Sequence, residues 1–155
     1  MNIRRAVDED ADVISLLNAE IQAQHAAALP WRFKPPGPET FPPEAVRALL
    51  GLPENHFFLA EPERAAVGYV YAEVVRRSET NITYAYDLIY VHHLYVRPDF
   101  RGLGIARTLL DVVRKVGGDL GIARLSLDVW TFNEDARAFF RRYGLIPYNE
   151  RLWHG

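Results

Sequence analysis

Two hydrophobic periodicities divide the chain into helices and strands. Apolar residues recur every three or four positions at Val13, Ile14, Leu17 and Ile21, which predicts a helix with one buried face. Strict alternation of apolar and polar residues, as over 124–129, predicts a half-buried strand. By these criteria we expect strands over 3–7, 57–61, 66–75, 84–96, 125–129 and 145–152. We expect four helices: one that is capped by Asp8–Asp10 and ends before Pro30, one over 43–51, one that begins near Gly104 and one that begins at Asn133.

The order of these elements predicts an α/β fold with one mixed sheet. It runs strand, two helices, three strands, helix, strand, helix, strand, which places helices on both faces of the sheet. The stretch Pro30–Pro43 holds six of the ten prolines together with Trp31 and Phe33, and it predicts a stiff, irregular loop. At 155 residues, with no internal repeat, we expect one domain over residues 1–155.

The segment from Val96 to Ala106, V-R-P-D-F-R-G-L-G-I-A, joins a buried strand to a helix that begins near Gly104. The first turn of a helix has backbone N–H groups without partners and carries the positive end of the helix dipole. Gly102 and Gly104 lack the side chains that would keep a ligand away from these groups. The segment therefore predicts a binding site for a pyrophosphate group.

The spacing of the glycines distinguishes this segment from two other phosphate-binding motifs. A P-loop has four residues between its glycines and then Lys-Ser or Lys-Thr, and a dinucleotide fingerprint has G-x-G-x-x-G. The chain instead has Arg101-x-x-Gly104-x-Ala106. This pattern resembles the (Arg/Gln)-x-x-Gly-x-(Gly/Ala) signature of the GNAT superfamily of acyl-CoA-dependent N-acyltransferases. On its own the pattern also fits an ordinary strand-to-helix turn.

A second segment carries the same resemblance. Residues 133–145, N-E-D-A-R-A-F-F-R-R-Y-G-L, are similar to the family's N-x-x-A-x-x-F-Y-x-x-x-G-F stretch. Asn133 suits the N-cap of a short helix, and Gly144 suits the position just past its end. The aromatic side chains of this helix share one face, which also predicts packing in the core. With both motifs in the family's order, the resemblance covers nearly the whole chain.

The resemblance implies the GNAT fold, in which the fourth and fifth strands splay apart where the glycine loop leaves the sheet. It implies acetyl-CoA as the acyl donor, with its pantetheine arm bonded like an added strand to the backbone of 94–96 and its pyrophosphate held by 101–107. Asn133 would reach the pantetheine or phosphate side, and Phe140 would lie along the thioester. The residues thus implied to bind acetyl-CoA are Leu94, Tyr95, Val96, Arg101, Gly102, Leu103, Gly104, Ile105, Ala106, Arg107, Asn133 and Phe140.

The same resemblance places His92 where some family members carry a carboxylate that takes the amine proton. A histidine titrates near neutrality, which suits a general base. The alternative is a buried histidine held by a backbone hydrogen bond. His92 and His93 lie on opposite faces of a regular strand and so would not share a metal, and we expect no metal site. Further candidate contributors are Glu73, Tyr84, Tyr86 and Asp128.

Phe140 departs from the family pattern, which often has a tyrosine at this position. Phenylalanine keeps the packing surface but has no hydroxyl to protonate the departing thiolate. Tyr143 lies three residues later on a similar face, where the family usually has an apolar residue, so we expect Tyr143 to pack rather than donate a proton.

Composition and charge narrow the functional classes. The chain has 18 Lys and Arg against 20 Asp and Glu, a balance that argues against nucleic acid or an anionic membrane as the main partner. It has no cysteine, which excludes a disulfide framework, a thiolate zinc site and an acyl-cysteine intermediate. The N-terminal residues contain no apolar run, and no stretch approaches a membrane span, so we expect a soluble, cytoplasmic protein.

We therefore expect an N-acetyltransferase that moves the acetyl group of acetyl-CoA to a primary amine by direct attack in a ternary complex. The loop Pro30–Pro43 is expected to cover the acceptor side and to favour an amine with an apolar body. One alternative, motivated by Phe140, is a module that binds or senses acyl-CoA without turnover. Another is a structural domain whose glycine loop is only a turn. Similar proteins commonly form homodimers, and the sequence leaves the oligomeric state open.

Overall fold

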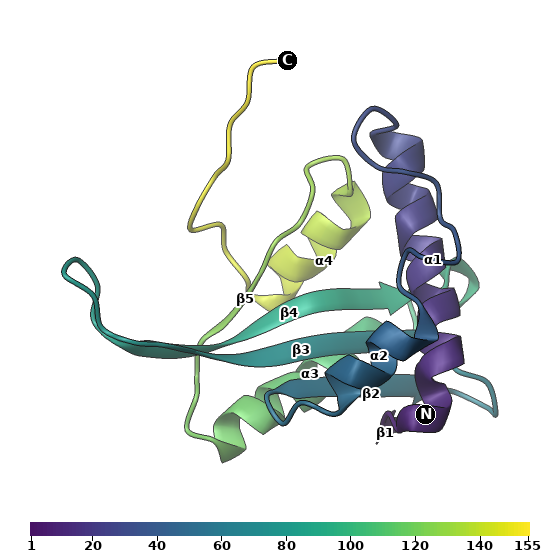
Figure 1. Ribbon diagram of the computed structural model, residues 1–155, viewed down its shortest axis with the longest axis horizontal. Coiled ribbons are helices and arrows are strands. Elements are labelled where there is room, and N and C mark those ends of the chain that lie inside the picture. Colours follow the sequence, from purple (N-terminus) through teal and green to yellow (C-terminus); the bar gives the residue numbers. More distant parts are fainter.

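The computed structural model describes residues 1–155 and contains one five-stranded sheet in the order β1-β2-β3-β4-β5 (Figure 1). Neighbouring strands from β1 to β4 are antiparallel, and β5 runs parallel to β4. The mixed sheet expected from the sequence is confirmed. The strands are β1 (Asn2–Arg5), β2 (Asn55–Glu61), β3 (Gly68–Arg77), β4 (Tyr86–Val96) and β5 (Leu125–Leu127).

Helices cover both faces of the sheet (Figure 1). They are α1 (Ala11–Ala28), α2 (Pro43–Leu50), α3 (Ile105–Asp119) and α4 (Glu134–Tyr143), with short 3₁₀ turns at Asp8–Asp10 and Pro98–Phe100. All four begin within a few residues of the positions expected from the sequence, and α1, α2 and α4 also end close to the expected positions. Both termini of α4 follow local signals, since Asn133 is its N-cap and Gly144 ends it at a φ of 108°.

Alternation along the strands builds a separate core on each face of the sheet. On one face, side chains such as Leu59, Tyr69 and Tyr71 pack against α1 and α2. On the other face, side chains such as Val70 and Val91 pack against α3, with the aromatic side chains of α4 at the margin. Because successive residues of a strand point to opposite faces, nearly every residue in the middle of β2 and β3 is buried.

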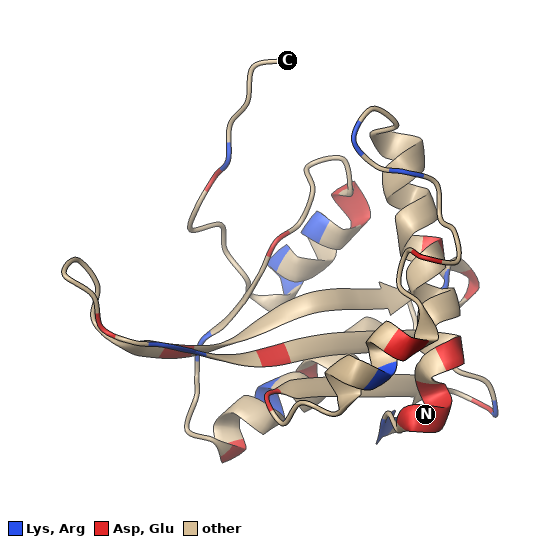
Figure 2. Ribbon diagram, in the orientation of Figure 1, with Lys and Arg blue, Asp and Glu red and all other residues tan.

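Acidic residues gather where β1 meets the start of α1 (Figure 2). The guanidinium of Arg4 donates to both carboxylate oxygens of Asp10, at 2.7 and 2.8 Å, and to Glu61 at 2.8 Å. Arg4 holds the pKa of the mostly buried Asp10 below its usual range. This network fixes the start of α1 to strands β1 and β2.

The strand expected over 145–152 is absent, so the order expected from the sequence is wrong at its last element. Residues after Gly144 form no regular structure and are almost entirely exposed. A strand needs a hydrogen-bonding neighbour, and β5 pairs only with β4. The strand expected over 125–129 is also shorter, because its pairing ends at Leu127. None of the helices is both long and apolar enough to cross a bilayer.

Candidate active site

The glycine loop between β4 and α3 presents a row of free backbone donors. Gly102 and Gly104 have φ values of 78° and 80°, in the left-handed region that favours glycine. These turns lead into α3 with Gly104 as its N-cap. The backbone N–H groups of residues 102–107 form no hydrogen bond within the protein. A Cβ placed on either glycine would meet no protein atom within 4 Å, so the space in front of these donors is open.

Arginine side chains surround this row of donors. Arg101, Arg107 and Arg142 line the adjacent cavity, and none of them forms an ion pair with a carboxylate. Arg101 is oriented by a 2.8 Å hydrogen bond from its Nε to the carbonyl of Val96. Arg97, by contrast, is paired with Glu20 of α1. The loop therefore combines free amides with positive charge, which suits a pyrophosphate group.

Strands β4 and β5 separate beside the loop. Their pairing stops at Val91 and Leu127, while β4 continues to Val96 without a neighbour on that edge. A cavity of about 730 Å³ occupies the opening. Its wall is formed by the end of β4, the glycine loop, α4 and the inner face of α1. The predicted splay between the fourth and fifth strands is thus present in the structure.

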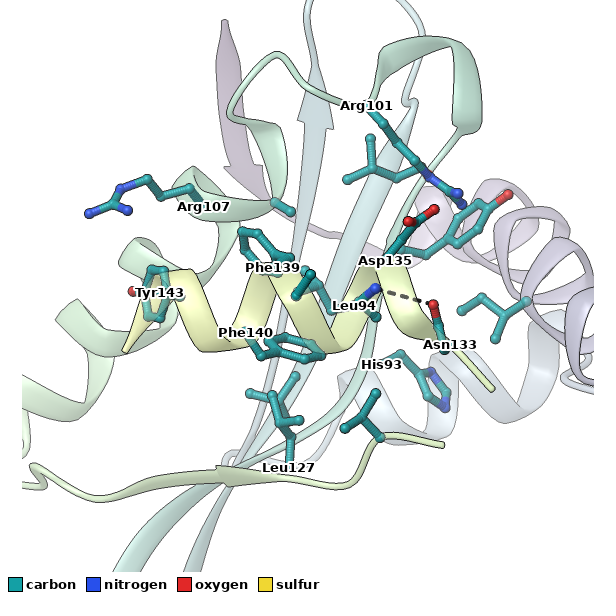
Figure 3. Close-up of a pocket in the computed structure, with 18 of the residues that line it drawn as sticks. His93, Leu94, Arg101, Arg107, Leu127, Asn133, Asp135, Phe139, Phe140 and Tyr143 are labelled. Carbon is teal, nitrogen blue, oxygen red and sulfur yellow. Dashed lines mark hydrogen bonds between the residues drawn. The ribbon is translucent and has the colours of Figure 1, made fainter. Parts of the chain in front are cut away.

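Figure 3 shows how side chains surround this cavity, with Arg107 and Tyr143 at one end of α4 and Asn133, Asp135 and His93 at the other. All of the residues expected to bind acetyl-CoA line the cavity except Leu103, whose side chain is 66% exposed and lies outside it. His92, the expected base, lines it too. The structure therefore brings segments from β4, α3 and α4 into one site.

A β-bulge in β4 places both neighbouring histidines on the same face of the sheet. Tyr71 of β3 pairs with His93 and Ala72 pairs with Val91, so His92 is an extra residue without a counterpart. The imidazole of His92 stacks on Tyr71, and that of His93 meets the same ring edge-on. The expectation of opposite faces, which holds for a regular strand, is wrong here because of the inserted residue.

His92 forms a close pair with a carboxylate of the neighbouring strand. Its Nε2 lies 2.7 Å from Oε2 of Glu73, and both side chains are about one third exposed. Because a carboxylate only accepts hydrogen bonds, the neutral imidazole donates its Nε2–H to Glu73. Nδ1 is then left with a free lone pair, which is what a general base requires. Glu73 was one of the candidate contributors from the sequence.

His93 is held in the neutral state by a different set of contacts. Asn18 donates to the hydroxyl oxygen of Tyr69, at 3.1 Å, and the hydroxyl lies 3.0 Å from Nδ1 of His93. With its oxygen accepting from Asn18, Tyr69 has its proton available for Nδ1. Burial lowers the pKa of His93 to about 4. At neutral pH His93 is therefore an uncharged hydrogen-bonding group.

The side chains of α4 divide between the cavity and the core. Oδ1 of Asn133 accepts from the amide of Ala136, at 3.2 Å, and caps the helix. Phe140 packs against Phe139 and contributes only apolar surface to the cavity. The hydroxyl of Tyr143 donates to Asp111 of α3, at 2.7 Å, and its ring lies beneath Arg107. These contacts direct the Tyr143 hydroxyl toward α3.

Sequence reasoning missed two groups beside the cavity. One is Tyr90, whose hydroxyl donates to Asp128, a contributor already expected from the sequence, and whose ring meets His92 edge-on. The other group is a closed cluster in which each ring contacts two others, with centroids 5.0 to 6.1 Å apart. Its aromatic residues were visible in the sequence, but nothing local indicated that the loops after α1 and β5 meet. The members of this cluster are His25, Phe33, Trp130 and Phe132.

Solved structures share the fold of this chain. The BH1408 protein of Bacillus halodurans, in a tetramutant form, superposes with a TM-score of 0.94 at 20% identity and covers 100% of this chain and 99% of its own. The aminoglycoside N-acetyltransferase AAC(6')-Iy in complex with a CoA-linked bisubstrate analogue gives a TM-score of 0.77 at 18% identity, covering 99% and 96%.

Sequence relatives match shorter stretches. Acetoin utilization protein AcuA of Bacillus subtilis is 38% identical over 84 residues, 52% of this chain and 37% of AcuA. Thialysine N-epsilon-acetyltransferase of Caenorhabditis elegans is 36% identical over 58 residues, 37% of this chain and 36% of that protein. The chain thus matches little more than a third of the length of these relatives. The model of the Acetyltransferase (GNAT) family matches residues 24–145. The chain therefore belongs to the GNAT acetyltransferase family.

Proposed function

We propose that this protein transfers the acetyl group of acetyl-CoA to a primary amine by direct attack in a ternary complex. The observation that carries the proposal is that one cavity is lined both by the glycine loop with its free amides and by His92, which is paired with Glu73. A donor bound along this cavity would have its phosphates at the glycine loop and its thioester near the bulge of β4.

Each part of the cavity matches a part of the donor. The amides of 102–107, with Arg101 and Arg107, are proposed to hold the pyrophosphate. The free edge of β4 offers the backbone of Leu94–Val96 to the pantetheine amides, as an added strand would use it. Asn133 and Phe140 are proposed to flank the arm from α4, with Phe140 beside the thioester.

The acetyl transfer itself needs a base and a polarised carbonyl. Acetyl-CoA supplies an acetyl group on a thioester. As the amine nitrogen bonds to the acetyl carbon and the carbon–sulfur bond breaks, His92 takes the amine proton on Nδ1, and Glu73 stabilises the imidazolium through Nε2–H. Backbone N–H groups at the free edge of β4 are proposed to polarise the carbonyl oxygen. With Phe140 in place of tyrosine, the thiolate takes its proton from solvent.

The acceptor is proposed to enter between α1 and the loop after β5. Trp130, His25 and Gln24 line that side of the cavity, and Asp128 supplies a carboxylate there. The loop that contains Phe33 does not line the cavity, but Phe33 packs against His25 and Trp130 and supports them from behind. These side chains favour a primary amine carried on an apolar body. The names of the relatives include a thialysine and an aminoglycoside acetyltransferase, which supports amine acceptors as a class.

The first test is the melting temperature of the purified protein with millimolar acetyl-CoA, with adenosine diphosphate as the control for binding at the nucleotide end alone. We expect a rise of several degrees that is specific to acetyl-CoA. Release of free thiol is then measured against a panel of primary amines. Binding without turnover of any amine would favour an acyl-CoA-sensing module, and no specific rise would overturn the proposal.

A further inference from the structure

We propose that His93 donates a hydrogen bond from its Nε2–H to an uncharged oxygen of the acceptor, so that this protein selects primary amines with a carbonyl or hydroxyl oxygen a few bonds from the nitrogen. This proposal rests on the proposed function and deepens it, because it concerns the acceptor of the same reaction. It gives a role in substrate specificity to His93, which lines the cavity but which the acetyl transfer does not use.

A buried chain of hydrogen bonds fixes which ring nitrogen of His93 carries the hydrogen. Asn18 donates to the hydroxyl oxygen of Tyr69 at 3.1 Å, and this hydroxyl lies 3.0 Å from Nδ1 of His93. Asn18 and Tyr69 are both buried, and burial raises the pKa of the Tyr69 hydroxyl, which therefore keeps its proton. Because the hydroxyl donates to Nδ1, the neutral imidazole carries its own hydrogen on Nε2.

The Nε2–H group of His93 is a donor without a partner in the protein. The single side-chain hydrogen bond of this ring is the one at Nδ1. No buried polar side-chain atom of the structure lacks a hydrogen-bond partner, so Nε2 is open to the cavity that His93 lines rather than enclosed. An acceptor that displaces water from this donor must offer an oxygen of its own, because an unpaired donor in a closed site is costly.

Three aromatic rings hold the imidazole of His93 in place. Phe41, Tyr69 and Tyr71 each meet it edge-on, with ring centroids 5.4, 5.9 and 5.4 Å away. Figure 3 shows the ring at the same end of the cavity as Asn133. A donor fixed in this way loses little conformational freedom when it binds an oxygen, which suits a group that determines specificity.

Tyr71 also places His93 beside the proposed base. The imidazole of His92 stacks on the ring of Tyr71, with centroids 4.5 Å apart, and His93 meets the edge of the same ring. The unpartnered Nδ1 of His92 and the Nε2–H of His93 therefore border one region of the cavity. An amine nitrogen at His92 and an oxygen at His93 fit within one small acceptor.

Charge at this end of the cavity favours an uncharged oxygen over a carboxylate. Burial lowers the pKa of His93 to about 4, so the ring brings no positive charge at neutral pH. The carboxylates of Asp128 and Asp135 line the cavity, and that of Glu73 lies beside the proposed base. The arginines beside the glycine loop are assigned to the pyrophosphate of the donor. An anionic acceptor would thus meet repulsion that the neutral His93 does not offset.

The first test compares acceptors that differ only in the group at the far end of the chain. The probes are 4-aminobutanamide, 4-aminobutan-1-ol, butylamine and 4-aminobutanoate, with glycinamide and 6-aminohexanamide and their matched amines to vary the spacing. We expect kcat/KM of the best amide or alcohol to exceed that of the alkyl amine of equal length by about tenfold or more. The amino acid should be the poorest acceptor of its length.

Variants assign this preference to His93. His93→Phe keeps a ring but has no donor, and it should remove the preference for the oxygen while leaving kcat/KM for the alkyl amine within about twofold. His93→Gln retains an N–H donor and should restore part of the preference. His56→Phe is the matched control, because His56 lies on β2 outside the cavity. Equal values for amide and alkyl amine at every length, or a preference that survives in His93→Phe, would overturn the proposal.

Nitrogen NMR of the histidine rings tests the same donor without turnover. In the full chain with coenzyme A at pH 7, the ring shifts of His93, assigned with His93→Gln, should place the hydrogen on Nε2. Tyr69→Phe should distribute it over both nitrogens. The amino amides should move the Nε2 resonance, and the alkyl amines should not. If this response occurs but no amine is acetylated, the proposed function is wrong and the oxygen site stands. A hydrogen on Nδ1, or an equal response to both kinds of amine, would overturn the site.

Discussion

Nε2 of His92 and Oε2 of Glu73 lie 2.7 Å apart across the neighbouring strands β4 and β3. Glu73 pairs in register with Tyr90, two positions from His92, and the bulge turns the imidazole back toward the carboxylate. The contact assigns the two ring nitrogens different roles. Nε2 is engaged by the carboxylate, and Nδ1 has no hydrogen-bond partner within the protein.

Replacing Glu73 tests whether this pairing positions the base. In Glu73→Gln the amide no longer stabilises an imidazolium, so we expect kcat to fall by roughly tenfold or more. KM for acetyl-CoA should stay unchanged, because the carboxylate lies away from the glycine loop. Glu54→Gln, an acidic residue near Tyr71 that forms no ion pair with His92, is the control. A change in KM without a change in kcat would contradict a positioning role.

Removal of the imidazole gives a larger effect. We expect His92→Ala to lower kcat by about 100-fold or more, the usual contribution of a general base. The dissociation constant for acetyl-CoA, measured by calorimetry, should be retained, because the proposed donor contacts are made by the glycine loop and the free edge of β4. Full activity in His92→Ala would exclude this residue as the base.

The glycine loop can be tested with a matched pair of glycines. Gly104 and Gly121 both have positive φ, 80° and 73°, and a Cβ at either meets no atom within 4 Å. Alanine at each position should therefore cost about 1 kcal/mol of stability through backbone strain alone. Only Gly104→Ala should weaken acetyl-CoA binding, by about fivefold or more, since only Gly104 lines the cavity. Equal weakening in both variants would contradict a phosphate-binding role for the loop.

The substitution Phe140→Tyr tests whether a hydroxyl at this position can act as the general acid that protonates the departing thiolate. Phe140 lines the cavity, and a hydroxyl on this ring would extend toward the proposed thioester. We expect a few-fold rise in kcat for an acceptor once one is known, because protonation of the thiolate by a positioned group replaces protonation by solvent. The melting temperature serves as the control for packing. A lower kcat at unchanged melting temperature would show that the site operates better without the hydroxyl.

His93 makes a specific contribution to acid stability. Its pKa is about 4 in the folded protein, against 6.5 for an ordinary histidine. Between these values the unfolded chain binds a proton that the folded protein does not, so stability falls as the pH falls through this window, by roughly 3 kcal/mol in total. Urea unfolding of His93→Gln should show a flatter decline from pH 6.5 to 4. His154→Gln, at the exposed C-terminus, should follow the wild type.

Features with local causes were predictable from the sequence. The N-cap at Asn133, the ends of α4 and the glycine turn before α3 depend on residues within a few positions of one another. The loop and the end of β4 were therefore expected to form one site before their geometry was known. The fold class followed from the order of periodic segments, because that order permits few arrangements of a mixed sheet.

Features that depend on distant residues were not predictable. The bulge at His92 is defined by the register of β4 against β3. The sequence of β4 alone does not show which of its residues lacks a counterpart. The contact of Phe33 with Trp130 joins loops almost 100 positions apart, and the sequence of neither loop predicts that the two meet. The strand expected over 145–152 had the right residues, but pairing requires a neighbour that the single chain does not supply.

The inserted residue at His92 also determines to which face of the sheet each later residue of β4 points. Because it shifts the strand by one position, Tyr95 points toward α1, where its hydroxyl meets Glu20, and Leu94 and Val96 point toward α3. Deleting a single residue there would turn the last part of β4 over, burying the tyrosine hydroxyl among aliphatic side chains and exposing Val96 to Glu20. The tolerance of this strand to substitution is therefore much greater than its tolerance to a change in length.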